Sequence, residues 1–176
     1  MPTEYKFVPV TRDDFPMLRR WLSEPHIGGW WGDPDTEIAL IEEDLKDGPT
    51  DMRIVWADRP FAYIQDYPAH HWDMPQYALF PKGTRAVDTF LGDPTYLGQG
   101  HAARYLRQRA QELLDGGYCG VVVDPSPDNA AAVRAYRGAG FVGDTVVPCE
   151  DGDPVLVLSF RGPKSQPSPE PERQVL

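Results

Sequence analysis

Leu97-Gly-Gln-Gly-His-Ala102 decides the fold, because it separates a short apolar segment from a long amphipathic one. Residues 87–91 before it have the composition of a strand, and residues 101–115 place their apolar side chains on one face at helical spacing. A strand, a glycine loop and a helix start present free backbone N–H groups to an anion, and Gly98 and Gly100 let the backbone approach a phosphate closely. The sequence therefore predicts a phosphate-bearing ligand at this loop.

Two features of the loop exclude the commonest phosphate-binding motifs. No Lys-Ser/Thr pair follows the glycines, so the loop is not a P-loop, and Ala103 stands where a dinucleotide fingerprint has its third glycine. The loop alone is equally consistent with an ordinary turn from strand to helix. A second motif favours a binding site: Asn129 is followed by Tyr136 and then by Gly140-Phe141.

These two motifs, in this order, resemble those of the GNAT acetyltransferase family. The pyrophosphate loop of that family reads Gln/Arg-x-x-Gly-x-Gly/Ala; Gly100 and Ala102 match it, and Leu97 replaces the usual Gln or Arg. The resemblance implies that acetyl-CoA is the co-substrate. The residues that it implies at the acetyl-CoA site are Phe90, Leu91, Leu97, Gly98, Gln99, Gly100, His101, Ala102 and Asn129.

Within the family, the chain is most similar to the aminoglycoside 6′-N-acetyltransferases, to which the siderophore and hydroxylysine acetyltransferases are related. In the drug-modifying branch, too, Leu stands at the position of Leu97. The resemblance implies an acyltransferase that acetylates the 6′-amine of an aminoglycoside by direct attack, and hence antibiotic resistance. Five segments carry it: Trp21-Leu22 with His26 and Trp30-Trp31-Gly32, Tyr63-x-Gln65-x-Tyr67, Arg85-x-x-Asp88-x-Phe90-Leu91, Leu97-Gly-Gln-Gly100, and Asp124-Pro-Ser-Pro-x-Asn129.

The order of expected elements indicates an α/β (α+β) domain with helices on both faces of a sheet. It agrees with the GNAT fold over residues 5–161, and the resemblance implies a mixed, mostly antiparallel sheet of six to seven strands with a splayed strand pair at the acetyl-CoA site. Strands are expected at 5–10, 52–57, 61–67, 85–91, 118–124, 141–148 and 154–160. Helices are expected at 15–22, from Pro34 with Ile38, Ile41 and Leu45 buried, at 101–115, and from a cap at Ser126 or Asp128 to Arg137.

Length and composition bound the remaining possibilities. A chain of 176 residues fits one domain, expected over 1–162, with a Pro-, Ser- and Glu-rich tail at 163–176. The net charge of −10 argues against nucleic acid or membrane partners and favours a cationic small molecule, although an acidic surface also serves solubility. Cys119 and Cys149 form no Cys/His cluster, so no metal is expected. The absence of a signal peptide or long apolar segment predicts a cytoplasmic protein. Many members of the family that it resembles dimerise, so a monomer or a homodimer is expected.

Asp88 and Tyr136 are the expected catalytic residues. An acceptor amine must lose a proton to attack a thioester, and a nearby carboxylate can act as the base. Asp is unfavourable in strands, which favours a function for Asp88 over an edge or bulge role. The resemblance places Asp88 as the base and Tyr136 as the acid that protonates the leaving thiolate, although Tyr136 could equally be a core residue. A backbone N–H of Phe90 or Leu91 is expected to hold the thioester carbonyl.

A polycationic acceptor also needs acidic and aromatic walls. Asp124 would serve equally well in a turn or helix cap, and Asp151 in a hairpin turn. Of the two adjacent Trp residues, we expect one to pack in the core and the other to line the cleft. The expected substrate-binding residues are Trp30, Trp31, Gln65, Asp66, Asp88, Asp124 and Asp151, with His26 as a minor candidate.

Three alternative functions remain open at this point. A siderophore-type enzyme would acetylate a hydroxylysine-like amine or hydroxylamine, and a basic residue facing the carboxylate of its acceptor would favour it. A non-catalytic acyl-CoA-binding domain is disfavoured by the presence of both Asp88 and Tyr136. An N-acetyltransferase for another amine or for a protein is the third alternative.

Overall fold

The computed structural model describes residues 4–160, which form a seven-stranded sheet in the order β1-β2-β3-β4-β5-β7-β6. All neighbouring strands are antiparallel except β4 and β5, which are parallel. The strands are β1 Lys6–Pro9, β2 Asp51–Trp56, β3 Pro60–Pro68, β4 Thr84–Leu91, β5 Gly120–Val123, β6 Phe141–Pro148 and β7 Pro154–Phe160. The helices are α1 Phe15–Leu22, α2 Pro34–Asp47, α3 His101–Asp115 and α4 Ala130–Ala139, with 3₁₀ turns η1 Arg12–Asp14, η2 Pro75–Tyr77 and η3 Pro94–Tyr96.

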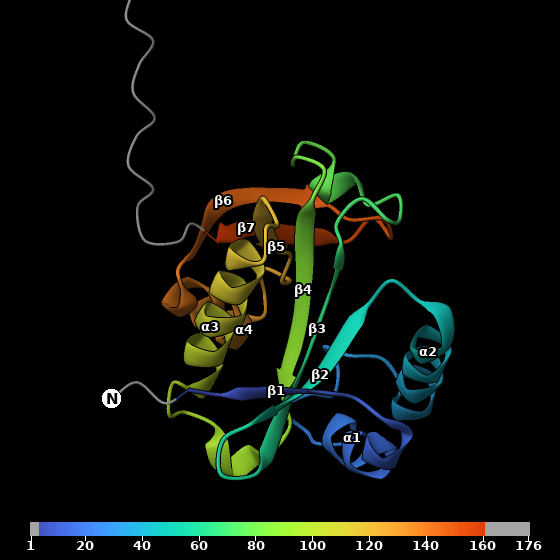
Figure 1. Cartoon of the computed structure of the whole chain (residues 1–176). Helices are drawn as coiled ribbons and strands as arrows, with labels where there is room; N and C mark the ends of the chain where they lie inside the picture. The colour runs from blue at the N-terminus through green and yellow to red at the C-terminus, as the bar shows by residue number, and fades with distance from the viewer. Residues whose placement is uncertain (1–3, 161–176) are drawn as a thin grey trace, which may run out of the picture.

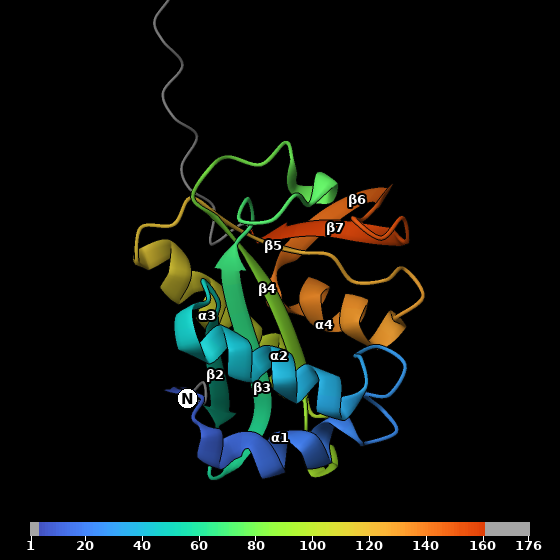
Figure 2. The same cartoon turned by 90° about the vertical axis from the view of Figure 1, so that its right-hand side faces the viewer.

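Helices cover both faces of the sheet, as the sequence predicts. In Figure 1, α1 and α2 lie on one side of the long central strands and α3 and α4 on the other; Figure 2 shows α2 crossing in front of β2 and β3. Successive side chains of a strand point to opposite faces, so β3 contributes Tyr63 to the core beneath α1 and α2 but Ile64 to the core beneath α3 and α4. The sheet therefore separates two apolar cores, and a third cluster of the described residues lies around Tyr67 and Tyr77.

The strands β4 and β5 separate after a short stretch of pairing. Only Thr84, Arg85 and Ala86 of β4 pair with β5, whereas β4 continues to Leu91 and remains paired with β3 along its whole length. One edge of the second half of β4 is consequently free of a neighbouring strand. This is the splayed pair that the sequence predicts, and it opens a gap beside residues 87–91.

Most predicted elements are present, with differences at their ends. The last helix begins at Ala130, because the side chain of Asn129, and not Ser126 or Asp128, accepts the N–H of Ala132 at 3.2 Å. On α2, Ile38 and Ile41 are buried but Leu45 is exposed. The predicted tail at 163–176 lies outside the described residues. Within residues 4–160, no helix combines the length and the apolar character needed to cross a membrane.

Candidate active site

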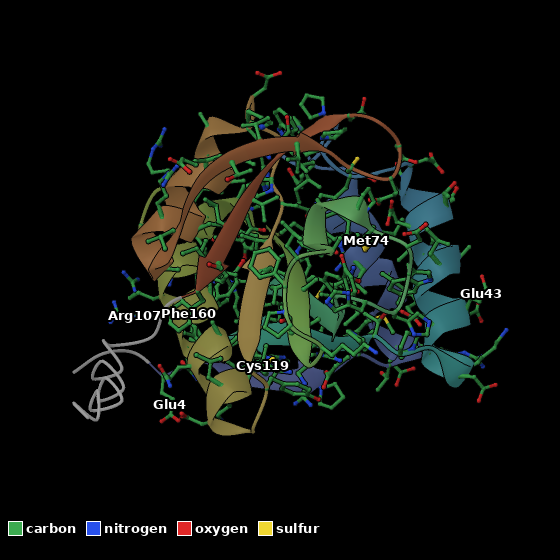
Figure 3. All side chains as sticks on the ribbon, turned by 90° about the horizontal axis from the view of Figure 1, so that it is seen from above. Glu4, Glu43, Met74, Arg107, Cys119 and Phe160 are labelled. Atoms are coloured by element: carbon green, nitrogen blue, oxygen red, sulfur yellow. The ribbon has the colours of Figure 1, made fainter. Side chains whose placement is uncertain are left out.

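An acidic cavity of about 700 Å³ lies between α2, the loop that follows β3, and the strands β3 and β4. Figure 3 looks onto this region from above and labels Glu43 of α2 and Met74 of the loop, which both line the cavity. No Lys or Arg of the described chain is among its lining residues. Six carboxylates line it: Glu37, Glu43, Asp44, Asp47, Asp88 and Glu150. Such a wall favours a ligand with several positive charges.

Asp88 lies on the wall of this cavity, directly opposite Gln65 of β3. The Nε2 of Gln65 donates a hydrogen bond of 2.9 Å to Oδ2 of Asp88. Removal from bulk water raises the pKa of Asp88 to about 7; the charges of Asp124 and Glu150 add to this increase, and the hydrogen bond from Gln65 opposes it. A carboxylate with this pKa can take up and release a proton near neutral pH, as a general base must.

Behind Asp88, one amide holds two further carboxylates. The Nε2 of the buried Gln76 donates to Oδ2 of Asp124 and to Oε2 of Glu150, each at 2.9 Å. Burial raises the pKa of Asp124, the hydrogen bond from Gln76 opposes this, and the charge of Glu150 adds to it. Glu150 reaches the cavity, whereas Asp124 is not among its lining residues and acts on Asp88 through its charge.

A second cavity, of about 390 Å³, opens at the gap between the splayed strands. Thr89, Phe90 and Leu91 of β4 line it, so the two cavities meet at consecutive residues of one strand, next to Asp88. The start of α3 forms another wall, with its unpaired first N–H groups and the positive end of the helix. This is the phosphate-binding arrangement that the sequence predicts.

Gly98 and Gly100 shape the loop at the start of α3. Their φ angles are +72° and +77°, a left-handed conformation that favours glycine. A Cβ atom at Gly98 would meet nothing within 4 Å, so the backbone there faces open space. A pyrophosphate fits this donor set, because both backbone and helix dipole offer positive charge without a side chain in between.

The loop brings most of the predicted cofactor residues to the second cavity. Its lining includes Phe90, Leu91, Leu97, Gly98, Gly100, His101, Ala102 and Asn129. Gln99 is not part of the lining, because its side chain folds back and donates to the carbonyl of Thr95 at 2.7 Å. At His101, Nδ1 is 2.8 Å from the hydroxyl of Tyr5, and the ring lies over Phe61 and Tyr96.

The backbone of β4 presents Leu91, and not Phe90, to the gap. The N–H of Gly92 donates a hydrogen bond to the carbonyl of Phe61 on β3. Alternate residues of an antiparallel strand point their N–H groups to the same side, so the N–H of Phe90 also points to β3. Both backbone groups of Leu91 point the other way, and its carbonyl lies 2.7 Å from Nε2 of His26. Of the two predicted carbonyl-binding donors, the strand pairing leaves Leu91 available.

Tyr136 projects from α4 into the same cavity. The side chain is only 7% exposed and its ring packs edge-on against Phe141. Burial, followed by the negative charge of Asp88, raises the pKa of Tyr136 well above its usual value. The phenol therefore carries its proton near neutral pH and can donate it to a departing group.

The adjacent Trp residues line the second cavity and are absent from the wall of the acidic one. Trp31 packs edge-on against Phe90, with ring centroids 4.9 Å apart, and also against Tyr63. Trp30 is half-exposed. The structure thus places one Trp against the core and leaves the other accessible, although both belong to the cavity beside the glycine loop.

Three predicted substrate-binding residues line neither cavity: Asp124, which lies behind Asp88, and Asp66 and Asp151, which lie farther away in the fold. Asp66 is 2% exposed and points to the opposite face of the sheet, where its carboxylate bonds Arg85 and Arg109 at 2.7 and 2.8 Å. The prediction for Asp66 is therefore wrong: its charge is already neutralised inside the core. Asp151 is exposed in the turn between β6 and β7 and lines neither cavity, whereas its neighbour Glu150 lines the acidic one.

Several residues of the acidic cavity were missed from the sequence. Four acids of α2 line the cavity, and three of them, Glu37, Asp44 and Asp47, recur at near-helical spacing, but this pattern is also that of a solvated helix face. Gln76 and Glu150 lie in irregular segments where no periodicity tells which way a side chain points. In the described chain, no three His, Cys, Asp or Glu side chains gather as a metal site would require.

Residues 10–148 match the sequence pattern that defines the acetyltransferase (GNAT) domain. The chain belongs to this family. The family and the fold predicted from the two motifs are thereby confirmed. Aminoglycoside N(6′)-acetyltransferase type 1 of Klebsiella pneumoniae is 28% identical over 166 residues, which cover 86% of this chain and 81% of that protein. A kanamycin resistance protein of Rhizobium radiobacter is 32% identical over 80 residues, or 45% of this chain and 74% of that protein.

Solved structures of acetyltransferases share this architecture. The structure of AAC(6′)-Ib in complex with paromomycin and acetyl-CoA superposes with a TM-score of 0.77 at 26% identity, covering 89% of this GNAT chain and 93% of that one. The same enzyme with coenzyme A and kanamycin gives a TM-score of 0.73 at 25% identity, covering 89% and 94%.

Proposed function

We propose that this GNAT protein transfers the acetyl group of acetyl-CoA to the 6′-amine of an aminoglycoside and so confers resistance to such drugs. The observation that carries the proposal is the acidic cavity, whose six carboxylates include Asp88 and whose lining in the described chain includes no Lys or Arg. Relatives named for this activity, and structures that hold aminoglycosides with coenzyme A or acetyl-CoA, support the same substrate pair.

The cavity also disfavours the siderophore-type alternative. A hydroxylysine-like acceptor carries its own carboxylate, which a basic side chain would have to meet. Asp88, Asp44 and Glu150 would instead repel it, because like charges at short range are unfavourable. Among the described residues, the cavity wall includes the imidazole of His71 but no ammonium or guanidinium group. A polycation has the opposite preference.

Asp88 provides the base for the attacking amine. It lies where the acidic cavity meets the gap of the splayed strands, and its raised pKa matches the proton transfer required. The surrounding carboxylates hold the other ammonium groups of the acceptor in place. The proton that the amine loses as it bonds to the acyl carbon passes to Asp88.

Leu91 and Tyr136 face the other side of the reacting bond. The N–H of Leu91 points into the gap, where it can bind a carbonyl oxygen as negative charge develops on it. Tyr136 holds the proton that a departing thiolate takes up. Acetyl-CoA supplies the thioester, and its pyrophosphate fits the backbone donors from Gly98 to Ala102.

The release of free thiol from acetyl-CoA, with kanamycin as acceptor, tests this function. Asp88→Asn keeps the shape of the side chain but removes the base, so we expect kcat/KM to fall by at least about 100-fold. Asp144→Asn, which makes the same change at an exposed position of β6, should leave the rate within about twofold. Nuclear magnetic resonance of the product should show the acetyl group on the 6′-nitrogen.

Two results would contradict the proposal. Turnover of hydroxylysine-type amines without any turnover of 6′-amino drugs would assign the chain to the siderophore branch. Binding of acetyl-CoA without turnover of either acceptor would indicate a non-catalytic domain.

A further inference from the structure

A partly buried chain of hydrogen bonds leads from the core to Asp88. The hydroxyl of Tyr63 donates to Oε1 of Gln65 at 2.7 Å, and Nε2 of the same amide donates to Oδ2 of Asp88 at 2.9 Å. Tyr63 is completely buried, and its ring is stacked on Phe90 with centroids 5.1 Å apart. Tyr63 lines neither cavity, and its hydroxyl is linked to Asp88 through the amide of Gln65.

The hydroxyl of Tyr63 selects one of the two orientations of the Gln65 amide. Burial, followed by the charge of Asp88, raises the pKa of Tyr63 well above its usual value, so the phenol carries a proton that needs an acceptor. In the observed orientation, Oε1 accepts this proton and Nε2 points at the carboxylate. In the reversed orientation, the amide oxygen would face a negative charge and the proton of Tyr63 would lose its acceptor.

The orientation of Gln65 matters because the charged groups around Asp88 are negative, so that its ionised form is favoured by hydrogen bonds from neutral groups, Gln65 and Tyr67. Gln65 opposes these charges with the positive end of an amide dipole. It engages Oδ2 and, together with the hydroxyl of Tyr67, favours the ionised carboxylate that can receive a proton from an acceptor amine. The titratable groups that face Asp88 or share its cavity are Tyr67 of β3, Asp124 after β5, Glu150 of the β6–β7 turn, His71 of the loop after β3, and Glu37, Glu43, Asp44 and Asp47 of α2.

We propose that Tyr63 is a positioning residue for the reaction: through Gln65 it favours the ionised form of Asp88 and fixes the hydrogen bond to its Oδ2. The proposal rests on the proposed function in so far as Asp88 is the base. It assigns a role to a core tyrosine that touches no substrate. No covalent step is added, because the hydrogen bonds only bias where the proton of the amine goes.

The consequence is a defect that depends on pH. A hydrogen bond to the charged form of an acid lowers its pKa, so Tyr63→Phe, which frees the Gln65 amide to reverse, should raise the pKa of Asp88. In the profile of kcat/KM against pH, we expect the acidic limb to shift to higher pH by about half a pH unit to one pH unit. Activity should fall about three- to tenfold on that limb and recover to within about twofold at high pH.

Matched variants separate this effect from loss of packing. Tyr63→Phe retains the ring that stacks on Phe90. The control, Tyr118→Phe, removes one hydroxyl at a half-exposed site away from both cavities and should leave the acidic limb of the pH profile unchanged. Gln65→Leu should move the limb at least as far, and Tyr63→Phe should add nothing in that background, since the tyrosine acts through the amide. A uniform loss of rate at every pH would overturn the proposal.

A measurement without turnover keeps this proposal distinct from the proposed function. In protein labelled with carbon-13 at aspartate carboxyls, the signal missing from Asp88→Asn identifies Asp88, and its titration gives the pKa directly. A higher pKa in Tyr63→Phe than in the wild type supports the relay even if no drug is acetylated. Equal pKa values in the two proteins would overturn it even if kanamycin proves to be a good substrate.

Discussion

Asp66 and Asp88 are acids on neighbouring strands of one sheet, yet they have opposite surroundings. Asp66 points beneath α3, where two guanidinium groups from Arg85 and Arg109 bind its carboxylate and leave it 2% exposed. Asp88 points to the other face, where its hydrogen-bond donors, Gln65 and Tyr67, are neutral and its charged neighbours are Asp124 and Glu150. One acid is neutralised by cations, and the other is surrounded by more negative charge.

The difference shows that the face of a strand, more than the residue type, decides what an acid does. Because side chains alternate along β3, Gln65 and Asp66 point to opposite sides, and only Gln65 reaches Asp88. An ion pair inside the core stabilises the fold but has no spare charge for a ligand. An acid among acids is costly to the fold and is therefore available to bind a cation or a proton.

The largest effect is expected when Asp66 loses its charge. Asp66→Asn leaves Arg85 and Arg109 as buried cations without their main partner, which typically costs about 3–5 kcal/mol of unfolding free energy. Urea unfolding measures the loss. The protein that remains folded should acetylate at a rate within about twofold of the wild type, because Asp66 faces away from both cavities. A stable variant with impaired catalysis would reverse the assignment of the two acids.

The same substitution at Asp88 should have the opposite sign. The pKa of Asp88 rises from 3.8 to about 7 on folding, so the folded state holds this proton more tightly than the unfolded state does. Both states are protonated below about pH 4, and the wild type carries the full cost of the charge above about pH 7. A shift of about three units corresponds to about 4 kcal/mol as an upper bound, reduced by the partial exposure of the side chain.

We therefore expect Asp88→Asn to stabilise the protein by about 1–3 kcal/mol near pH 8 and to have little effect near pH 4. Thermal unfolding of both proteins at the two pH values gives the comparison. Equal stabilities near pH 8 would show that Asp88 is solvated well enough to be charged without cost. Destabilisation would show that its carboxylate is paired much as that of Asp66 is.

The fold could be predicted because its signals are local. Helical and strand periodicity, helix caps and the glycine loop all depend on residues that are neighbours in sequence. The predicted helices α1 to α4 and strands β1 to β7 therefore differ from the structure mainly at their ends. The cofactor loop was predictable for the same reason, since Gly98 and Gly100 act through the backbone of a contiguous segment.

The acceptor site could be predicted only in part, because it is assembled from distant segments. Asp88 was identifiable as an acid that a strand disfavours. Asp66 in β3 carries the same signal, and only the positions of Arg85 and Arg109 beneath α3 give it a structural role. In the turn after β6 no alternation applies, so the sequence pointed to Asp151 where the backbone presents Glu150.

That neighbouring pair allows the mildest test of the comparison. Glu150→Gln removes one of the six carboxylates on the cavity wall, and we expect it to raise the KM for kanamycin about three- to tenfold, in keeping with a partly exposed ion pair. Asp151→Asn removes the same charge one residue away, outside the lining, and should change the KM by less than about twofold. If both substitutions raise the KM equally, the cavity attracts the drug through its overall electrostatic field. If only Glu150→Gln raises the KM, direct contact at the cavity wall determines drug binding, just as the face of the strand distinguishes Asp88 from Asp66.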